Sequence, residues 1–399
     1  MNVQTPIALL GGISPELFMA KFWQKKPLII RAAVPGLQPL VGRDDLFAMA
    51  ANDAVESRLI ERKNGQWAFK HGPFNQTAAQ ADGGKTSKTP SLKKPDWTLL
   101  VQGVDMHHDG VHQLLQQFRF VPDARLDDLM ISYATAGGGV GPHFDSYDVF
   151  LLQASGRRRW RIGAQKDLSL RDDVPLKILA NFTPTQHFDL NPGDMLYLPP
   201  RYAHDGVALD NDCQTYSIGF RAPSTEELAR ELMHRVADEI ENDSLYTDRT
   251  QAATAQPGAI PADLQNFAQQ AVAKALQDGT LMQQILGEYL TEPKQNVWFD
   301  AAPAADIKPA KNSATKKANN LVARATHGVR LDRRSRMMYD AKHVYLNGDS
   351  WKVAGKDAKL LRKLADDRSL PATDVVAASA ELQSALTQFK EQGWLHHDG

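Results

Sequence analysis

The chain has almost no cysteine and no long apolar run. Its single cysteine, Cys213, excludes an internal disulfide and a thiolate-rich zinc site. No segment approaches the roughly 20 consecutive apolar residues that a membrane-spanning helix needs, and no basic region precedes an apolar N-terminal run. The formal net charge of −1 argues against a protein that binds polyanions over its whole surface. These absences favour a reducing, cytoplasmic setting.

Composition divides the N-terminal half into regions. With 42% hydrophobic residues, a chain of 399 residues can bury a large core and fill two or three domains. Ser14 followed by Pro15 predicts a helix start, and residues 27–30 form an extended segment. Residues 76–95 are rich in Gly, Thr, Ser, Lys and Ala, which indicates a mobile surface insertion.

From about 97 to 222 the pattern is one of short strands separated by turns such as Pro192-Gly193-Asp194. Many short strands with regular turns favour a sandwich or a barrel. The strands are expected at residues 97–101, 129–133, 149–152, 159–162, 195–198 and 215–218.

After Pro223 the pattern becomes helical. Ser224 and Glu227 form a capping box that predicts a helix to about residue 240, and a second helical stretch covers 262–290 with an interruption at Gly279. Residues 301–320 are rich in Ala, Lys, Pro and Asn and are expected to be a linker or exposed loop.

The last seventy residues combine a hairpin with helices. Asn347-Gly348 predicts the turn of a hairpin within 343–351, and helical patterns follow at 356–364 and 382–392. This combination is compatible with a winged-helix module.

A candidate metal site comes from two separated motifs. His143 and Asp145 are two apart within Gly-Pro-His-Phe-Asp, and His204 follows about sixty residues later. Residues i and i+2 of a strand project to the same face, so this pair can bind one ion together. Two imidazoles and one carboxylate occupy one face of an octahedron, leave the opposite face open, and suit non-heme Fe(II) in an oxygenase.

Other histidines compete for this role. His187-Phe188-Asp189 repeats the tripeptide but lacks a later lone histidine at the same spacing, which makes it the weaker pair. His108 and His112 have a helical metal spacing, yet no matching acid–base signature accompanies them. We interpret these two as structural or surface histidines.

The strand expected at 159–162 contains an arginine that should be buried. Alternation places Arg158 on the same face as Trp160 and Ile162, which should point into the core. A buried guanidinium requires an anion, and a dicarboxylate cosubstrate would supply one through a bidentate contact. A basic surface strand would explain Arg157, Arg159 and Arg161, but not this arginine.

These motifs resemble those of the JmjC-type 2-oxoglutarate oxygenases. The resemblance rests on residues 130–150, on Gly-Arg-Arg-Arg-Trp at 156–160, and on Pro-Gly-Asp-Met-Leu-Tyr-Leu-Pro-Pro at 192–200. It is dense from about 125 to 222. More narrowly, the order of regions along the whole chain is similar to that of the bacterial ribosomal oxygenases.

The resemblance implies an α+β fold class with a double-stranded β-helix (jelly-roll, JmjC/cupin-like) catalytic barrel. It implies an oxygenase domain at 1–222 with its core at about 97–222, a helical dimerisation region at 223–295, and a linker with a winged-helix-like domain at 296–399. It also implies Fe(II), 2-oxoglutarate and O2 as cofactor and cosubstrates. His143, Asp145 and His204 are then the metal ligands, and Arg158 pairs with the distal carboxylate of 2-oxoglutarate.

The function that the resemblance implies is a 2-oxoglutarate-dependent dioxygenase that hydroxylates an arginine side chain of large-subunit ribosomal protein sixteen, and that forms a homodimer through the 223–295 helices. Alternatives are a histidine or asparagine target on another ribosomal protein, a cupin enzyme that does not use 2-oxoglutarate, and a non-catalytic nucleic-acid-binding regulator. Lysine demethylation is possible for the fold, but nothing in the sequence selects methyl-lysine.

A basic region near the C-terminus allows contact with RNA. Residues 301–349 hold ten Lys or Arg against four Asp or Glu, and Arg330, Arg333, Arg334 and Arg336 cluster. Beside a winged helix such a region suggests nucleic acid. A solvated linker with a structural or protein-docking module explains it about equally well.

Overall fold

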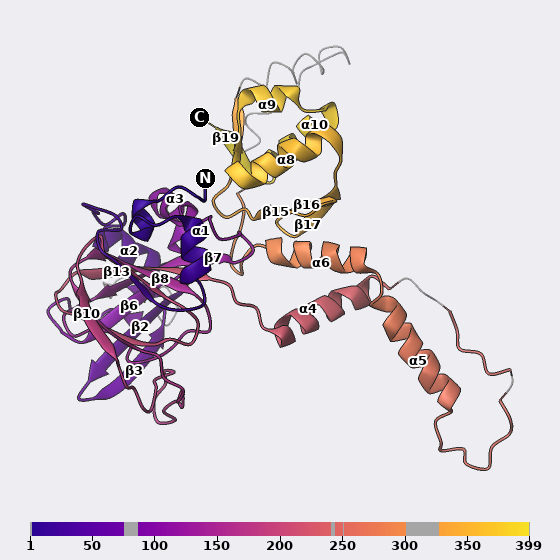
Figure 1. Ribbon diagram of the computed structural model, residues 1–399, viewed down its shortest axis with the longest axis horizontal. Coiled ribbons are helices and arrows are strands. Elements are labelled where there is room, and N and C mark those ends of the chain that lie inside the picture. The colour runs from indigo at the N-terminus through magenta and orange to yellow at the C-terminus, as the bar shows by residue number, and fades with distance from the viewer. Residues whose placement is uncertain (1, 76–86, 241–243, 250, 301–326, 399) are drawn as a thin grey trace. The chain divides into compact units, whose positions relative to one another are not determined.

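A computed structural model describes residues 2–75, 87–240, 244–249, 251–300 and 327–398 (Figure 1). The chain divides into two compact units, residues 1–222 and 223–399. The predicted linker at 301–320 lies outside the described residues. Among the described residues, no helix is both long enough and apolar enough to cross a membrane.

The first unit begins with short helices. Among the described residues its helical elements are η1 (Ala8–Leu10), α1 (Pro15–Lys21), α2 (Arg43–Ala50), η3 (Val104–Met106) and α3 (Asp109–Gln116). The predicted start of α1 is confirmed: the Ser14 side chain accepts a hydrogen bond of 3.2 Å from the Leu17 amide, and Pro15 occupies the first helical position.

An eight-stranded antiparallel sheet, the major sheet, forms the body of this unit. Its order is β1-β11-β8-β13-β7-β6-β2-β3. The strands are β1 (Leu28–Ile30), β2 (Ser57–Lys63), β3 (Gln66–His71), β6 (Trp97–Val101), β7 (Leu126–Ala134), β8 (Val149–Ser155), β11 (Met195–Leu198) and β13 (Cys213–Phe220).

A smaller antiparallel sheet, the minor sheet, has the order β10-β9-β12. Its strands are β9 (Arg158–Gly163), β10 (Gln186–Leu190) and β12 (Ala203–Ala208). All six strands that the sequence predicted between 97 and 222 are present. The sequence patterns did not identify β2, β3, β10 or β12.

The predicted insertion at 76–95 divides into two parts. Residues 76–86 lie outside the described residues. Residues 87–95 are ordered, because β5 (Ser87–Lys88) pairs in parallel with β4 (Phe74–Asn75) and a turn then leads to β6. The prediction of an unstructured segment is therefore wrong for residues 87–95.

Side-chain alternation along β8 separates two layers of core. Phe150 and Leu152 belong to the cluster that joins the major sheet to the N-terminal helices. Val149 and Leu151 point the other way and pack in one cluster with Trp160 of the minor sheet. The two sheets therefore face each other across a shared interior, the arrangement of a jelly roll.

The second unit starts with three helices, α4 (Thr225–Asp238), α5 (Ala262–Ala275) and α6 (Gly279–Thr291). The predicted capping box at Ser224 and Glu227 is present, with both of its hydrogen bonds. The predicted interruption near Gly279 is also present: α6 begins there, and the Asp278 side chain accepts bonds from its first amides.

In the remainder of the second unit, residues 327–398 form two small sheets and three helices. Its elements are β14 (Gly328–Leu331), β15 (Met337–Tyr339), β16 (His343–Leu346), β17 (Asp349–Lys352), α8 (Gly355–Asp367), β18 (Ser369–Leu370), α9 (Ala372–Ala377), α10 (Ala380–Glu391) and β19 (Leu395–Asp398). Asn347 and Gly348, both at positive φ, form the predicted turn between β16 and β17.

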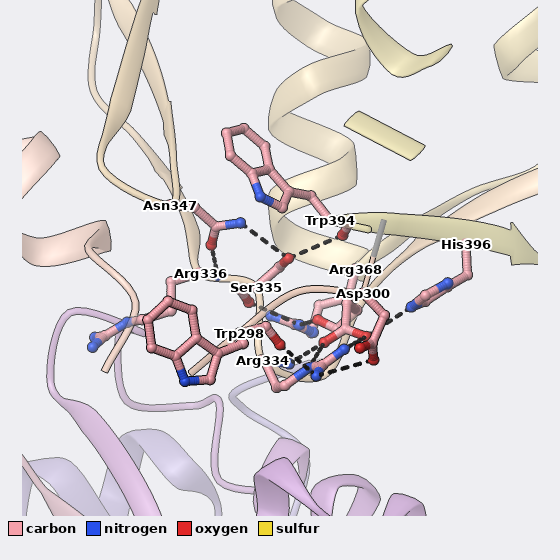
Figure 2. Close-up of polar contacts among 10 residues, drawn as sticks. Trp298, Asp300, Arg334, Ser335, Arg336, Asn347, Arg368, Trp394 and His396 are labelled. Carbon is pink, nitrogen blue, oxygen red and sulfur yellow. Dashed lines mark hydrogen bonds and ion pairs between the residues drawn. The ribbon is translucent and has the colours of Figure 1, made fainter. Parts of the chain in front are cut away.

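A buried carboxylate, Asp332, connects several segments of this unit. Figure 2 shows its partners Arg334, Arg368 and His396. Arg334 donates to both of its oxygens at 2.8 and 3.2 Å, and the His396 imidazole lies 2.7 Å from one of them. Arg368 donates to the backbone carbonyl of Asp332 at 2.7 Å. Burial alone raises the pKa of Asp332, but the hydrogen bonds from Arg334 and His396 outweigh it and lower this pKa to about 2.

We expect Asp332→Asn to destabilise the second unit in a pH-dependent way. The folded-state pKa is depressed from 3.8 to about 2, so the carboxylate contributes about 2 kcal/mol above pH 4, and this contribution is lost as pH falls from about 4 to 2. Urea unfolding followed by hydrogen–deuterium exchange of peptides from 327–398 measures it at pH 6 and pH 3. Exposed Asp349→Asn is the control. An equal loss at both pH values would show that packing, not charge, is responsible.

Candidate metal centre

Three side chains that can bind a metal converge on the inner side of the minor sheet. His204 lies on β12, and a backbone bridge joins it to His143: each amide donates to the other's carbonyl, at 2.9 and 2.8 Å. Asp145 follows two residues later. The ligand atoms of the three lie within 4.8 Å of one another, and they form the one such cluster among the described residues.

Backbone carbonyls fix both imidazole rings. His143 Nδ1 lies 2.9 Å from the Gly141 carbonyl oxygen, and His204 Nδ1 lies 2.9 Å from that of Tyr202. A carbonyl accepts only from N–H, so each Nδ1 carries the proton and each Nε2 keeps its lone pair for a metal. Gly141 has a φ of +79°, and a Cβ there would come within 3.0 Å of Trp67, so a side chain would displace this loop.

The electrostatics of the cluster favour neutral imidazole. Burial, with a smaller contribution from the neighbouring His143, lowers the pKa of His204 to about 4. A metal ligand must offer a free lone pair, so a histidine that resists protonation suits this position. Two neutral imidazoles and the Asp145 carboxylate match the donor set of a non-heme Fe(II) site with open positions.

The other histidines considered from the sequence lie elsewhere. On β10, His187 is exposed, and Asp189 forms a two-point ion pair with Arg159 at 2.8 and 3.0 Å. His108 lies before α3 and caps it, because its Nδ1 accepts from the Val111 amide. It therefore does not form a helical i, i+4 pair with His112.

Arg158 is buried as alternation predicted. It is 3% exposed, and its Nη1 donates to the Gly206 carbonyl at 3.3 Å. Its Nε and Nη2 have no hydrogen-bond partner among the described residues. A buried guanidinium without a carboxylate costs several kcal/mol, so this position requires an anion from outside the protein chain. A carboxylate of 2-oxoglutarate fits these two donors.

The cluster and Arg158 open into one pocket of about 310 Å³ between the two sheets. Asp128 of β7 is 4% exposed and lines the pocket. Its Oδ2 accepts from the Gln102 side chain at 2.7 Å and from the Gly103 amide at 3.0 Å. Gln102 in turn accepts from Arg58 at 2.6 Å.

The sequence analysis missed Asp128, although a signal was available. Met130 and Ser132 lie on the same pocket-facing side of β7, so period-two alternation extends to residue 128. Tyr147 also lines the pocket. Burial raises the pKa of its hydroxyl, and the carboxylates of Asp145 and Asp128 raise it further, which indicates a negative potential at this part of the pocket.

Comparison with known proteins supplies relatives for both units. A model of the JmjC domain matches residues 113–228, and a model of the ROXA-like winged helix matches residues 274–396. The chain is 33% identical over 289 residues to the ribosomal protein uL16 3-hydroxylase of Escherichia coli (strain K12), covering 72% of this chain and 73% of that protein. It is 37% identical over 220 residues to a probable ribosomal oxygenase of Haemophilus influenzae, covering 54% and 52%.

Solved structures agree over nearly the full length. A crystal structure of Escherichia coli YcfD matches with a TM-score of 0.79 and 27% identity, covering 96% of this chain and 98% of that one. A structure of the same ribosomal oxygenase in complex with cobalt and 2-oxoglutarate matches with a TM-score of 0.76 and 28% identity. The fold class expected from the sequence, a jelly roll with helices and a winged helix, is confirmed.

We expect Asp145→Ala to weaken metal binding by more than the roughly 100-fold that loss of an outer-shell partner can cost. The variant loses the single carboxylate of the cluster and keeps both imidazoles. Calorimetric titration with Mn(II) measures the affinity without turnover. His187→Ala, in the second His-Phe-Asp tripeptide, is the matched control and should bind normally. Unchanged affinity in Asp145→Ala would remove this residue from the ligand set.

Proposed function

Because the chain belongs to the family of JmjC-type ribosomal oxygenases, we propose that it hydroxylates an arginine side chain of large-subunit ribosomal protein uL16. It is a 2-oxoglutarate-dependent hydroxylase that uses Fe(II) and O2. The choice of arginine rests on one observation above all, the buried carboxylate of Asp128 in the pocket that also contains the metal cluster.

The residues of the metal centre take these roles in the proposal. His143, Asp145 and His204 hold Fe(II), and Arg158 binds the distal carboxylate of 2-oxoglutarate through its two unpartnered donors. The metal and cosubstrates together supply the oxidising chemistry, in which 2-oxoglutarate becomes succinate and carbon dioxide while one oxygen atom enters a C–H bond. The surrounding sheets hold the target carbon in place and exclude water.

The pocket supports a cationic target with a long apolar stem. Leu100 and Met130 contribute apolar wall, and Asp128 offers a fixed negative charge. Hydrogen bonds from Gln102 and the Gly103 amide hold one oxygen of Asp128 in place, so its orientation is set before a substrate enters. A guanidinium brings the permanent positive charge that this carboxylate attracts, which a neutral histidine or an asparagine does not.

We expect incubation of recombinant uL16 with this protein, Fe(II), ascorbate and 2-oxoglutarate to add one oxygen atom to an arginine. Intact-mass and peptide analysis locates the oxygen, and Asp145→Ala is the inactive control. Asp128→Asn should lower kcat/KM for uL16 by about 10- to 100-fold, the loss of one charge-assisted hydrogen bond. Asp189→Asn, on the outer side of the minor sheet, should have no such effect.

Two outcomes would contradict the proposal. Oxygen on a histidine, asparagine or lysine would replace the arginine assignment. Succinate release with ribosomal extract but no change in uL16 would retain the oxygenase and assign it another ribosomal protein. A cytoplasmic location follows from a ribosomal target and stays a prediction.

The homodimer through residues 223–295 also stays a prediction. Helix α5 has no buried residue, and its Leu264 and Val272 are exposed, as is Leu276 directly after it, which supports a partner on this helix. Helix α4 contacts α6 within the unit, and its Arg235 pairs with Glu292 at 2.8 Å. Sedimentation at micromolar concentration tests the dimer, and a monomeric mass contradicts it.

Contact with RNA, if made through the second unit, requires cations other than Arg334. This arginine is engaged within the unit, since it also donates to the Trp298 carbonyl at 2.7 Å (Figure 2). It also lies over the Phe299 ring. The exposed residues of α10, the helix that reads nucleic acid in many winged helices, carry no positive charge. They are Ala380, Glu381, Ser384, Gln388 and Glu391.

Four exposed lysines supply an alternative surface. They are Lys342, Lys352, Lys356 and Lys359, and none has an ion-pair partner in the described part of the chain. Three of them follow one another along the end of β17 and the first turns of α8. The Val353 amide donates to the Lys342 carbonyl at 3.1 Å, which places the fourth beside them. We propose this lysine surface as the RNA contact.

We expect a labelled RNA hairpin to bind in a salt-dependent way through the lysine surface. Replacing Lys352, Lys356 and Lys359 by alanine should reduce the slope of log affinity against log salt by roughly one per lysine. Fluorescence anisotropy at several KCl concentrations measures this slope. Arg330→Ala is the control. If this variant reduced the slope more than the lysine replacements do, the RNA contact would be assigned to the arginine cluster instead. Absence of binding at low salt would leave the module structural.

A further inference from the structure

A second buried donor besides Arg158 lacks a partner in the pocket. Trp160 is 5% exposed and lines the same pocket as Arg158 and His204. Its indole Nε1–H is buried and has no hydrogen-bond partner among the described residues. A buried donor without a partner costs about 1–3 kcal/mol, so the fold is expected to supply this N–H with an acceptor when the pocket is filled.

The position of the Trp160 ring follows from the pairing of β9 with β12. Trp160 lies opposite Gly206, and a Cβ at residue 206 would come within 2.6 Å of the six-membered ring. The glycine therefore makes room for the indole to lie against the neighbouring strand. The Arg158 guanidinium lies 5.9 Å from the ring centroid, and the His204 ring lies 5.9 Å away. Trp160 thus stands next to both the metal cluster and the proposed anion-binding arginine.

Apart from the metal-binding atoms, the buried side-chain atoms of this pocket that lack a hydrogen-bond partner among the described residues are all donors. They are Arg158 Nε, Arg158 Nη2 and Trp160 Nε1. No described residue that lines the pocket contributes a buried acceptor lacking a partner. A ligand that satisfies three donors and needs no donor in return is rich in acceptors, as a dicarboxylate is. A bound water would satisfy one of them but would not neutralise the guanidinium.

We propose that the Trp160 indole N–H donates a hydrogen bond to an oxygen of 2-oxoglutarate, beside Arg158, and so takes part in binding the cosubstrate. The inference rests on the proposed function, in which 2-oxoglutarate occupies this pocket. Arg158 supplies a positive charge. Trp160 supplies an uncharged N–H donor, and its direction is set because the indole ring packs against Gly206. The two side chains, two residues apart on one face of β9, form a single binding edge.

The indole N–H can be observed directly by nuclear magnetic resonance. The chain has 7 tryptophans, so ¹⁵N-indole labelling gives a small set of N–H signals, and Trp160→Phe identifies one of them. Zn(II), which accepts histidine and carboxylate ligands, replaces Fe(II) so that the sample is diamagnetic and inactive. On addition of 2-oxoglutarate we expect the Trp160 proton to move downfield and to exchange more slowly with solvent. A Trp160 signal that stays unchanged while 2-oxoglutarate binds would overturn the proposal.

Affinity provides a second readout. Calorimetric titration of the Zn(II) protein with 2-oxoglutarate should show roughly tenfold weaker binding for Trp160→Phe, which keeps a ring but loses the donor. Trp351→Phe, in the second unit, is the control and should bind normally. The Trp160 signal can also be assigned by elimination, from phenylalanine replacements of the other six tryptophans, so the resonance experiment does not depend on whether Trp160→Phe folds.

Arg158→Ala shows whether a negative result contradicts only the Trp160 contact or also the proposed oxygenase function. If Arg158→Ala loses 2-oxoglutarate binding while Trp160→Phe and the indole signal do not change, the Trp160 contact fails and the oxygenase stands. If neither variant changes the affinity, the whole binding edge on β9 is wrong. If 2-oxoglutarate does not bind the Zn(II) protein at all, the proposed function fails together with the inference.

Discussion

The alternation of side chains along β9 determines which arginine is available to a ligand. Arg157, Arg159 and Arg161 point outward, and each pairs with an aspartate, namely Asp210, Asp189 and Asp205. Arg158 points inward beside Trp160, where the described residues offer it no carboxylate. A shift of one residue in this strand would place three arginines in the core, so the register of the minor sheet and the anion binding that we propose for Arg158 depend on the same constraint.

The metal cluster depends on the minor sheet in a different way. His143 and Asp145 belong to a loop, and their positions are set by the backbone bridge from His143 to His204 on β12. The bridge brings together residues that are 61 apart in the sequence, and the carbonyls of Gly141 and Tyr202 then orient the rings. A loop alone would leave these side chains mobile. Because the bridge fixes the loop to β12, the metal-binding side chains keep their positions.

Local pattern was enough to predict much of this protein. The strands at 97–101 and 195–198, the capping box at Ser224 and the turn at Asn347-Gly348 each carry their signal within a few residues. Strand β12 was missed because its sequence, Ala-His-Asp-Gly-Val-Ala, has neither apolar alternation nor β-branched enrichment. Its sheet position comes from pairing with β9, and its glycine accommodates Trp160, which only tertiary structure reveals.

Charge was harder to interpret than periodicity. The arginines near residue 334 counted as a basic cluster because the sequence shows neither the carbonyl of Trp298 nor the contact between Asp332 and His396. In the pocket, by contrast, an important charge was not predicted. Asp128 was missed because its partners, Gln102 and Gly103, follow the end of β6 and are distant from it in the sequence. The free energy of a charge depends on its partners, and those partners are mostly distant in sequence.

The pocket separates opposite charges onto opposite sheets. The donors Arg158 and Trp160 come from β9 of the minor sheet, whereas Asp128 comes from β7 of the major sheet. Arg58, the cation that the major sheet adds to the pocket, lies 3.6 Å from Glu56 and is partly offset by it. An anionic cosubstrate and a cationic side chain can therefore occupy one chamber against different walls. Neither has to displace the other's partner, which is the condition that an oxygenase acting on arginine must meet.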